Sequence, residues 1–208
     1  MVIIPHVSPC LHLNRNTALV GSSGSLKKSQ YGSLIDNYND VIRFNYAPTN
    51  GFQSDVGSKT TLRVVNNHVF DNFDLSKEGY TKSPKNFVRE LRNQKILYVG
   101  PTLKPWSRRS KNAHFSNDLF LFDYKSISVL KILMKCNFPQ NLLVGTIVIG
   151  LCVLAGIRPT IFGFDLKPRP RTHYWQERPK NWNSSDHNPL EEQKVIIELA
   201  SRNLINVA

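Results

Sequence analysis

Cysteine is scarce in this sequence. Only Cys10, Cys136 and Cys152 occur among 208 residues, an odd number with no C-x-x-C spacing. Such a set indicates neither a disulfide framework nor a zinc site. It favours a reducing compartment, in which Cys136 and Cys152 serve as small apolar residues.

Long hydrophobic runs and targeting signals are also absent. The longest apolar stretch, Leu142 to Ile157, is shorter than the roughly 20 residues that span a membrane, so it predicts a buried helix. Met1 to Pro5 is too short and too uncharged at its start for a secretory signal. Repeats, low-complexity tracts and long Gly/Ser linkers are missing. We therefore expect one domain over residues 1–208, in the cytoplasm.

Acidic side chains are outnumbered. There are 15 Asp and Glu against 27 Lys and Arg, which gives a net charge of +12. The excess is concentrated in Lys77 to Lys111, and it predicts either an anionic partner, including a membrane surface, or a basic face exposed to solvent. A nucleic-acid-binding module is the alternative that charge allows, but only Trp106 beside Arg108 and Arg109 suggests it, and no recognised nucleic-acid motif is present. We expect no nucleic-acid partner.

The pattern of apolar residues predicts an α/β fold. Strands and helices alternate, which favours a mostly parallel, Rossmann-like sheet flanked by helices, with ligands outside the carboxyl ends of the strands. The expected strands are Thr17 to Val20, Val41 to Asn45, Leu62 to Asn66, Ile96 to Val99 and Thr160 to Phe164. The expected helices are Gln30 to Tyr38, Lys85 to Arg92, Ser126 to Lys135, Gly145 to Ala155 and Pro189 to about Asn203.

A glycine-rich loop follows the first expected strand. Gly21, Ser22, Ser23 and Gly24 lie between that strand and a helix, an arrangement typical of phosphate binding. The loop is not a Walker motif, because Leu26 stands where that spacing requires glycine, and it lacks the dinucleotide fingerprint and the nucleophile elbow. A tight strand-to-helix connection without a ligand is the alternative.

The run from Ala18 to Thr61 resembles the long sialylmotif of the animal-type sialyltransferases, glycosyltransferase family 29. Three further segments resemble the family's other motifs in the expected order: Gly145 to Gly163, then Arg171 to Trp175 with its His-Tyr-aromatic mark, and His187 with Glu192. The shared residues of the long motif include Gly21, Ser23, Gly24, Leu26, Lys27, Tyr31, Gly32, Ile35, Asp36, Arg43, Asn45, Ala47 to Thr49, Gly51, Phe52 and Asp55 to Thr61.

Some positions depart from the family. Ser22 stands where the family usually has Asn, and Leu143 and Val144 stand where it has Ser and Thr, so Thr146 is expected to supply the hydroxyl. The positions of the family's disulfide fall on Thr17 and Gly156, which agrees with a reducing compartment. A Golgi location follows instead if an anchor precedes Met1.

The resemblance implies an inverting, metal-independent transferase with a variant of the GT-A fold. It would move sialic acid from CMP-sialic acid to a hydroxyl of a glycan or glycolipid acceptor, without a cofactor; CMP-Kdo is the alternative donor, and a binding module without catalysis is the rival class. No Asp-x-Asp pair is present to hold a divalent ion.

Two histidines are the expected catalytic residues. By resemblance His187 is the base and His173 stabilises the leaving phosphate, and imidazoles suit both tasks because they titrate near neutral pH. Glu192 is expected to orient His187, or else to be an ordinary first-turn acid. The expected nucleotide-sugar-binding residues are Gly21, Ser22, Ser23, Gly24, Asn45, Gly145, Thr146, Gly163, Tyr174 and Trp175. Asn45 could instead cap a turn, and the two aromatics could belong to the core.

Overall fold

A computed structural model describes residues 13–66, 94–100, 119–166, 173–176 and 187–208. Its centre is a seven-stranded sheet in the order β5-β4-β3-β2-β1-β6-β7, and every neighbouring pair is parallel. The strands are β1 (Thr17–Val20), β2 (Asp40–Phe44), β3 (Leu62–Asn66), β4 (Lys95–Gly100), β5 (Leu119–Asp123), β6 (Thr160–Phe162) and β7 (Asn206–Val207).

The five expected strands are all present, and the α/β prediction is confirmed. Two of them end earlier than expected, because Asn45 and Gly163 take left-handed backbone angles, with φ of 46° and 67°, which an extended strand cannot contain. The sequence reading missed β5 and the two-residue β7.

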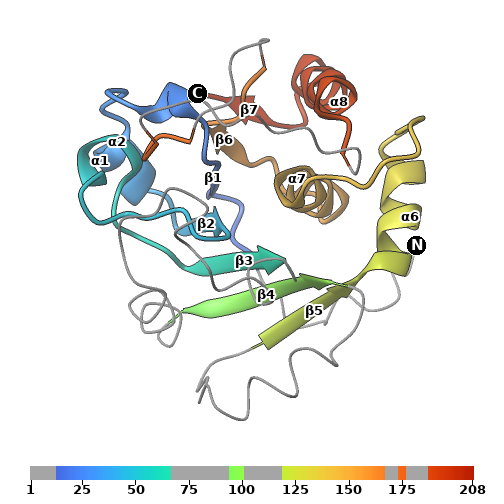
Figure 1. Ribbon diagram of the computed structural model, residues 1–208, viewed down its shortest axis with the longest axis horizontal. Coiled ribbons are helices and arrows are strands. Elements are labelled where there is room, and N and C mark those ends of the chain that lie inside the picture. The colour runs from blue at the N-terminus through green and yellow to red at the C-terminus, as the bar shows by residue number, and fades with distance from the viewer. Residues whose placement is uncertain (1–12, 67–93, 101–118, 167–172, 177–186) are drawn as a thin grey trace.

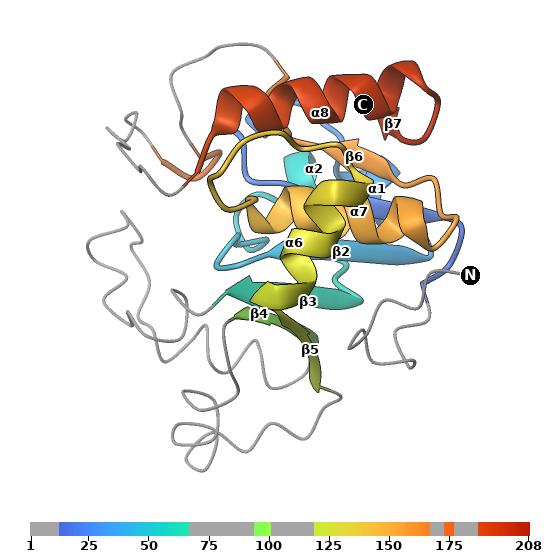
Figure 2. The same ribbon diagram turned by 90° about the vertical axis from the view of Figure 1, so that its right-hand side faces the viewer.

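Helices cover both faces of the sheet. They are α1 (Gly32–Asp36), α2 (Gln53–Val56), α6 (Tyr124–Leu133), α7 (Val144–Leu154) and α8 (Pro189–Ser201), with a short 3-10 helix η1 (Gly24–Leu26). In Figure 1, α1 and α2 lie on the left of the sheet and α6, α7 and α8 on the right; Figure 2 shows the latter three from their own side. The expected helix Lys85 to Arg92 lies outside the described residues, and α2 was not expected.

Each face of the sheet has its own apolar core, because side chains alternate along the strands. Toward α6, α7 and α8 the buried residues include Leu19, Ile42, Val64, Leu97 and Ile161. Toward η1, α1 and α2 they include Ala18, Val20, Val41, Phe162 and Tyr174. Burial on both faces explains why the strands read as continuous apolar runs.

The three longer helices end in the same way. In each, the second residue beyond the helix takes a left-handed φ, at Lys135, Gly156 and Asn203. The next residue donates its N–H to a carbonyl five positions back, as Cys136 does to Lys131 at 2.8 Å. This is the Schellman motif, and it fixes the direction of the chain after each helix. Gly156, one of the positions where the family has cysteine, therefore has a backbone role here.

The strand order places a topological switch point between β1 and β6. The chain proceeds from β1 through β2, β3 and β4 to β5 on one side of β1, and β6 then joins β1 on the other side. In open parallel sheets, ligands bind outside the carboxyl ends of the strands at such a point. The loops after β1 and β6 thus define where a ligand is expected.

Two carboxylates hold the segments around α1 and α2. Asp55 of α2 accepts the backbone N–H groups of Lys28 at 2.8 Å and Gln30 at 3.1 Å. Both of those residues have left-handed φ angles, 65° and 59°, which are costly for residues with a Cβ. Asp55 therefore stabilises the connection that leads from η1 to α1.

Asp36 makes the reciprocal contact from α1. It accepts the N–H groups of Ser58 and Lys59 and the Ser58 hydroxyl, each at 2.9 Å. Partial burial raises the pKa of this carboxyl, but these hydrogen bonds outweigh it, so the net shift of the Asp36 pKa is downward.

Replacing Asp36 with Asn should lower the free energy of unfolding at pH 7 by about 1–2 kcal/mol, because hydrogen bonds to a charged acceptor are lost. Since the folded pKa lies below the unfolded value, this stabilisation is present above about pH 3.9 and is lost as the pH falls through the folded pKa. Denaturant unfolding from pH 7 downward measures it, with exposed Glu198→Gln as the control. An Asp36→Asn deficit that is the same at every pH would contradict this account.

Candidate functional site

The topology brings nearly all the predicted site residues to one edge of the sheet. Gly21 follows β1, Asn45 follows β2 and Gly163 follows β6, so these lie at the carboxyl ends of parallel strands. Helices that run back between parallel strands begin at the same edge, which places the start of α7 and the start of α8 there too. The positive ends of two helix dipoles therefore face the edge where an anionic ligand is expected.

The glycine loop packs directly against the end of β6. Gly21 donates its N–H to the carbonyl of Phe162 at 2.7 Å, and Ser23 donates to the carbonyl of Gly163 at 3.1 Å. A Cβ on Gly21 would lie 2.4 Å from the Gly163 oxygen, so only glycine fits. A Cβ on Gly163 would meet the side chain of Leu26 at 2.4 Å. Both predicted glycines are required by this close approach.

Ser23 is the structural centre of the loop. It is buried, its Oγ accepts the N–H of Ser25 at 3.0 Å and donates to Asp165, and it caps η1, whose first residue is Gly24. Ser22 accepts the N–H of Tyr174 at 3.1 Å through its carbonyl. Asp165 was not among the predicted site residues, although it follows the Gly163-Phe164 pair of the short motif.

His173 lies beside this loop. Its backbone forms an isolated antiparallel bridge with Ser23. Its ring stacks on the Trp175 indole, with centroids 4.5 Å apart and planes 11° from parallel. This stacking fixes the orientation of the His173 ring beside the loop. The turn is closed by Gln176, whose N–H donates to the His173 carbonyl at 2.9 Å.

The Tyr174 side chain points away from the His173 ring and into the apolar core between the sheet and η1, α1 and α2. Only 1% of the residue is exposed, its hydroxyl donates to the carbonyl of Pro48, and its ring meets Phe52 edge-on at 5.3 Å. Burial raises the pKa of its phenol, although Arg43 and Arg63 act to lower it. Tyr174 is packed as a core residue, the alternative that its sequence left open, while Trp175 is half-buried.

Asn45 sits in a turn fixed by two buried arginines. Arg43 and Arg63 lie directly opposite each other on β2 and β3, 0% and 1% exposed. Arg63 donates to the carbonyls of Asn45 at 3.3 Å and Ala47 at 2.9 Å, and Arg43 to the carbonyl of Val56 at 2.6 Å. Burial, followed by the charge of Arg63, lowers the pKa of Arg43 to about 10.

The Asn45 side chain takes part in the same turn. Its Oδ1 accepts the N–H of Asn66 at 3.2 Å, across the ends of β2 and β3. This contact agrees with the turn-cap interpretation of Asn45. It also holds the amide at the carboxyl edge of the sheet, where a ligand contact is expected.

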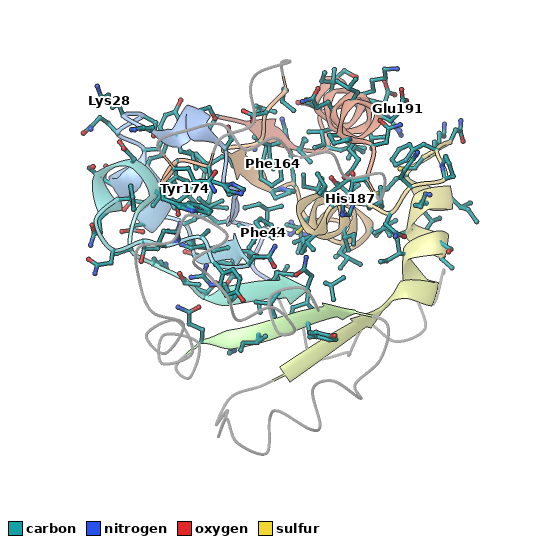
Figure 3. The ribbon with its side chains drawn as sticks, viewed as in Figure 1. Lys28, Phe44, Phe164, Tyr174, His187 and Glu191 are labelled. Carbon is teal, nitrogen blue, oxygen red and sulfur yellow. The ribbon has the colours of Figure 1, made fainter. Side chains whose placement is uncertain are left out.

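The start of α7 is pressed against the end of β6. A Cβ on Gly145 would lie 2.8 Å from the Phe164 ring, which in turn meets Phe44 edge-on at 6.0 Å. In Figure 3, Phe164 and Phe44 lie between Tyr174 on one side and His187 on the other. Thr146 is 2% exposed in the first turn of α7, so its hydroxyl is covered by protein.

His187 lies just ahead of the N-cap of α8. Asn188 is the N-cap, accepting the N–H of Glu191 at 3.3 Å, and Pro189 is the first helical residue. The Nδ1 atom of His187 lies 2.8 Å from the carbonyl oxygen of Asn141. Because a carbonyl only accepts, Nδ1 carries the proton, and the lone pair of the neutral ring is on Nε2.

Glu192, which was expected to orient His187, contacts the segment ahead of α7. It is 1% exposed, and its Oε2 accepts the N–H of Leu143 at 2.9 Å, just ahead of α7. The carbonyl of Asn141, two residues earlier in the same segment, contacts the imidazole directly. Glu191, in the first turn of α8, contacts the ammonium of Lys194 at 2.6 Å.

Sequence reasoning did not find Asn141 because it acts through its backbone carbonyl, which leaves no side-chain signature. In the part of the chain that the structure describes, no three His, Cys, Asp or Glu side chains gather in a way that could hold a metal ion. Over the same residues, none of the helices has the length and apolar character needed to cross a membrane. The basic stretch Lys77 to Lys111 lies largely outside the described residues.

Comparison with known families identifies the first part of the chain. Residues 11–98 match the model of glycosyltransferase family 29 (sialyltransferase). Mouse beta-galactoside alpha-2,6-sialyltransferase 1 is 60% identical over 52 residues, which cover 25% of this chain and 13% of the mouse protein. The human protein of the same name is 56% identical over 83 residues, 39% of this chain and 18% of that protein.

A relative with another stated linkage has a similar level of sequence identity. Pig CMP-N-acetylneuraminate-beta-galactosamide-alpha-2,3-sialyltransferase 1 is 60% identical over 51 residues, 24% of this chain and 15% of the pig protein. The matches to these curated relatives thus span less than a fifth of each relative's length.

The fold of a mammalian sialyltransferase crystal structure matches 97% of this chain and 71% of its own, with a TM-score of 0.70 and 24% identity. A mammalian sialyltransferase in complex with Gal-beta-1-3GalNAc-ortho-nitrophenol matches 92% of this chain and 68% of its own, with a TM-score of 0.65 and 23% identity. At these identities the solved structures establish the fold. The sequence similarity to glycosyltransferase family 29 covers residues 11–98, which is less than half of the chain.

Proposed function

We propose that this chain transfers sialic acid from CMP-sialic acid to a hydroxyl group of a galactoside, with inversion at the anomeric carbon. The observation that carries the proposal is the direct backbone bridge between the Gly21–Gly24 loop and His173, at the switch-point edge where His187 also precedes α8. The names of the relatives, which are sialyltransferases acting on beta-galactosides, support the same donor and acceptor classes.

The donor side of the site is built from the loop and the α7 start. The CMP phosphate lies at the edge formed by the glycine loop and the start of α7, where the helix dipole presents partial positive charge. Trp175 offers a flat surface beside His173, and Asn45 offers an amide at the end of β2. Ser22, Gly24, Gly145, Thr146 and Gly163 shape this side, and Tyr174 supports it from the core.

In the proposed transfer, His187 and His173 have different roles. The acceptor oxygen attacks the anomeric carbon, the bond from that carbon to the CMP phosphate oxygen breaks, and the acceptor proton passes to Nε2 of His187. The Asn141 carbonyl favours the tautomer that this step requires. His173, oriented by its stacking on Trp175, stabilises the negative charge that develops on the departing phosphate.

The protein is proposed to work in a reducing compartment. Thr17 and Gly156 replace the family's cysteine pair, and Thr17 is instead buried with its hydroxyl donating to the Asn14 carbonyl. The site then needs no disulfide to form, which supports work in a reducing compartment such as the cytoplasm; an oxidising lumen is the alternative. Activity measured with and without a thiol reductant distinguishes a structure that depends on disulfides from one that does not.

Replacing Gly21 with Ala should weaken CMP binding at least about tenfold, because the new Cβ would meet the Gly163 carbonyl and push the loop from β6. Isothermal titration calorimetry with CMP measures the affinity. Exposed Ser33→Ala on α1 is the control and should bind as the unmodified chain does. Equal CMP affinity for Gly21→Ala, in a variant that is folded by circular dichroism, would remove the loop from the donor site.

Replacing His187 with Ala should lower the rate of CMP release in the presence of a galactoside acceptor by roughly 10²–10⁴-fold, the usual contribution of a general base. Its CMP affinity should stay within about twofold, because the base contacts the acceptor. His173→Ala should reduce both rate and CMP affinity. Unchanged turnover by His187→Ala would refute its role as the base.

The donor sugar is tested separately. CMP-sialic acid and CMP-Kdo are offered in turn to the unmodified chain, since the residues that contact CMP do not select the sugar. Transfer from CMP-Kdo alone would replace the proposed donor while keeping the reaction class. Salt-sensitive DNA binding without CMP affinity would favour the nucleic-acid alternative.

A further inference from the structure

The segment Phe138–Leu143, which joins α6 to α7, is attached to three different helices. Lys131 of α6 donates from its Nζ to the carbonyls of Phe138 and Gln140, the latter at 3.0 Å. Its ammonium also lies 5.1 Å from the centroid of the Phe138 ring. One cation thus fixes two carbonyls of this joining segment, immediately before the residue that holds His187.

The end of α6 keeps Lys131 in place for this task. The Schellman motif at Lys135 turns the chain back, and its N–H to carbonyl bond from Cys136 ends on Lys131 itself. The joining segment therefore returns past the side chain of Lys131. Leu142, 2% exposed, anchors the far end of the segment in the core.

The remaining contacts lead to the proposed base. Asn141 accepts the imidazole Nδ1–H of His187 through its carbonyl, and Leu143 donates its N–H to Glu192 of α8. His187 and Glu192 lie at the start of α8, so the segment connects that start to α6. Lys131 and Glu192 act in opposite directions on the pKa of Cys136, which burial raises, so both charges act on this segment.

We propose that Lys131 is a positioning residue for His187. It holds the Phe138 and Gln140 carbonyls so that the next carbonyl, that of Asn141, meets Nδ1 of the imidazole and keeps the proton there. This inference rests on the proposed role of His187 as the base. Lys131 touches neither reactant, and it acts through the joining segment alone.

The consequence of losing Lys131 follows from the geometry. Without the ammonium, the Phe138 and Gln140 carbonyls turn to water, and the Asn141 carbonyl is no longer fixed opposite the ring. The neutral imidazole is then free to place its proton on Nε2, the atom that must accept the acceptor proton. The rate of transfer falls as the fraction of His187 rings with the proton on Nε2 rises. The donor loop after β1 is unaffected.

The test compares Lys131→Met, Lys131→Arg and Lys135→Met in the full chain. Lys131→Met should lower kcat about tenfold with the KM for CMP-sialic acid within about twofold, since small displacements of a catalytic group are costly. Lys131→Arg keeps a cationic donor and should recover most of the rate. Lys135→Met removes the same charge from an exposed position one turn on and should match the unmodified chain.

A second readout does not depend on turnover. Nitrogen-15 NMR of the imidazole, assigned with His187→Gln, should show the Nδ1–H tautomer in the unmodified chain and a growing Nε2–H population in Lys131→Met. An unchanged tautomer and rate in Lys131→Met would overturn the proposal. An unmodified chain that holds the Nδ1–H tautomer but transfers nothing would instead count against the proposed function.

Discussion

The close approach of Gly21 to Gly163 is the contact on which the site depends. Two strand ends that are far apart in sequence meet there without a side chain between them, joined by N–H to carbonyl bonds of 2.7 and 3.1 Å. Because neither position has room for a Cβ, the loop after β1 is held against the end of β6 at the switch point of the sheet. Ser23, capping η1 and bridged to His173, continues the same contact toward the proposed catalytic residues.

The direction of the helices completes the site electrostatically. Both α7 and α8 begin at the edge where β1 and β6 end, and both starts are stabilised by an anionic or polar side chain: Glu192 at the residue before α7, and Asn188 at α8. Fixed partial charges of this kind are suited to binding an anionic group such as a phosphate. The family match covers residues 11–98, and the sheet brings the loop after β1 from that part of the chain to the same edge as the two helix starts.

Much of this arrangement could be predicted from local signals. The β1 and β3 strands have the expected bounds, and the α8 start was readable from Asn188 and Pro189, since capping is a local rule. The ends of β2 and β6 could not be read, because the left-handed angles of Asn45 and Gly163 depend on neighbouring strands. Contacts made by backbone groups, such as that of Asn141 with His187 and that of Leu143 with Glu192, leave no side-chain pattern in the sequence and could not be predicted.

The most direct measurement is a crystal structure of the chain with CMP bound. The account predicts the phosphate between the Gly21–Gly24 loop and the His173 ring, at the carboxyl ends of β1 and β6, with Nε2 of His187 facing the space beyond the phosphate. CMP bound elsewhere on the chain, or a phosphate that touches neither the loop nor His173, would contradict it.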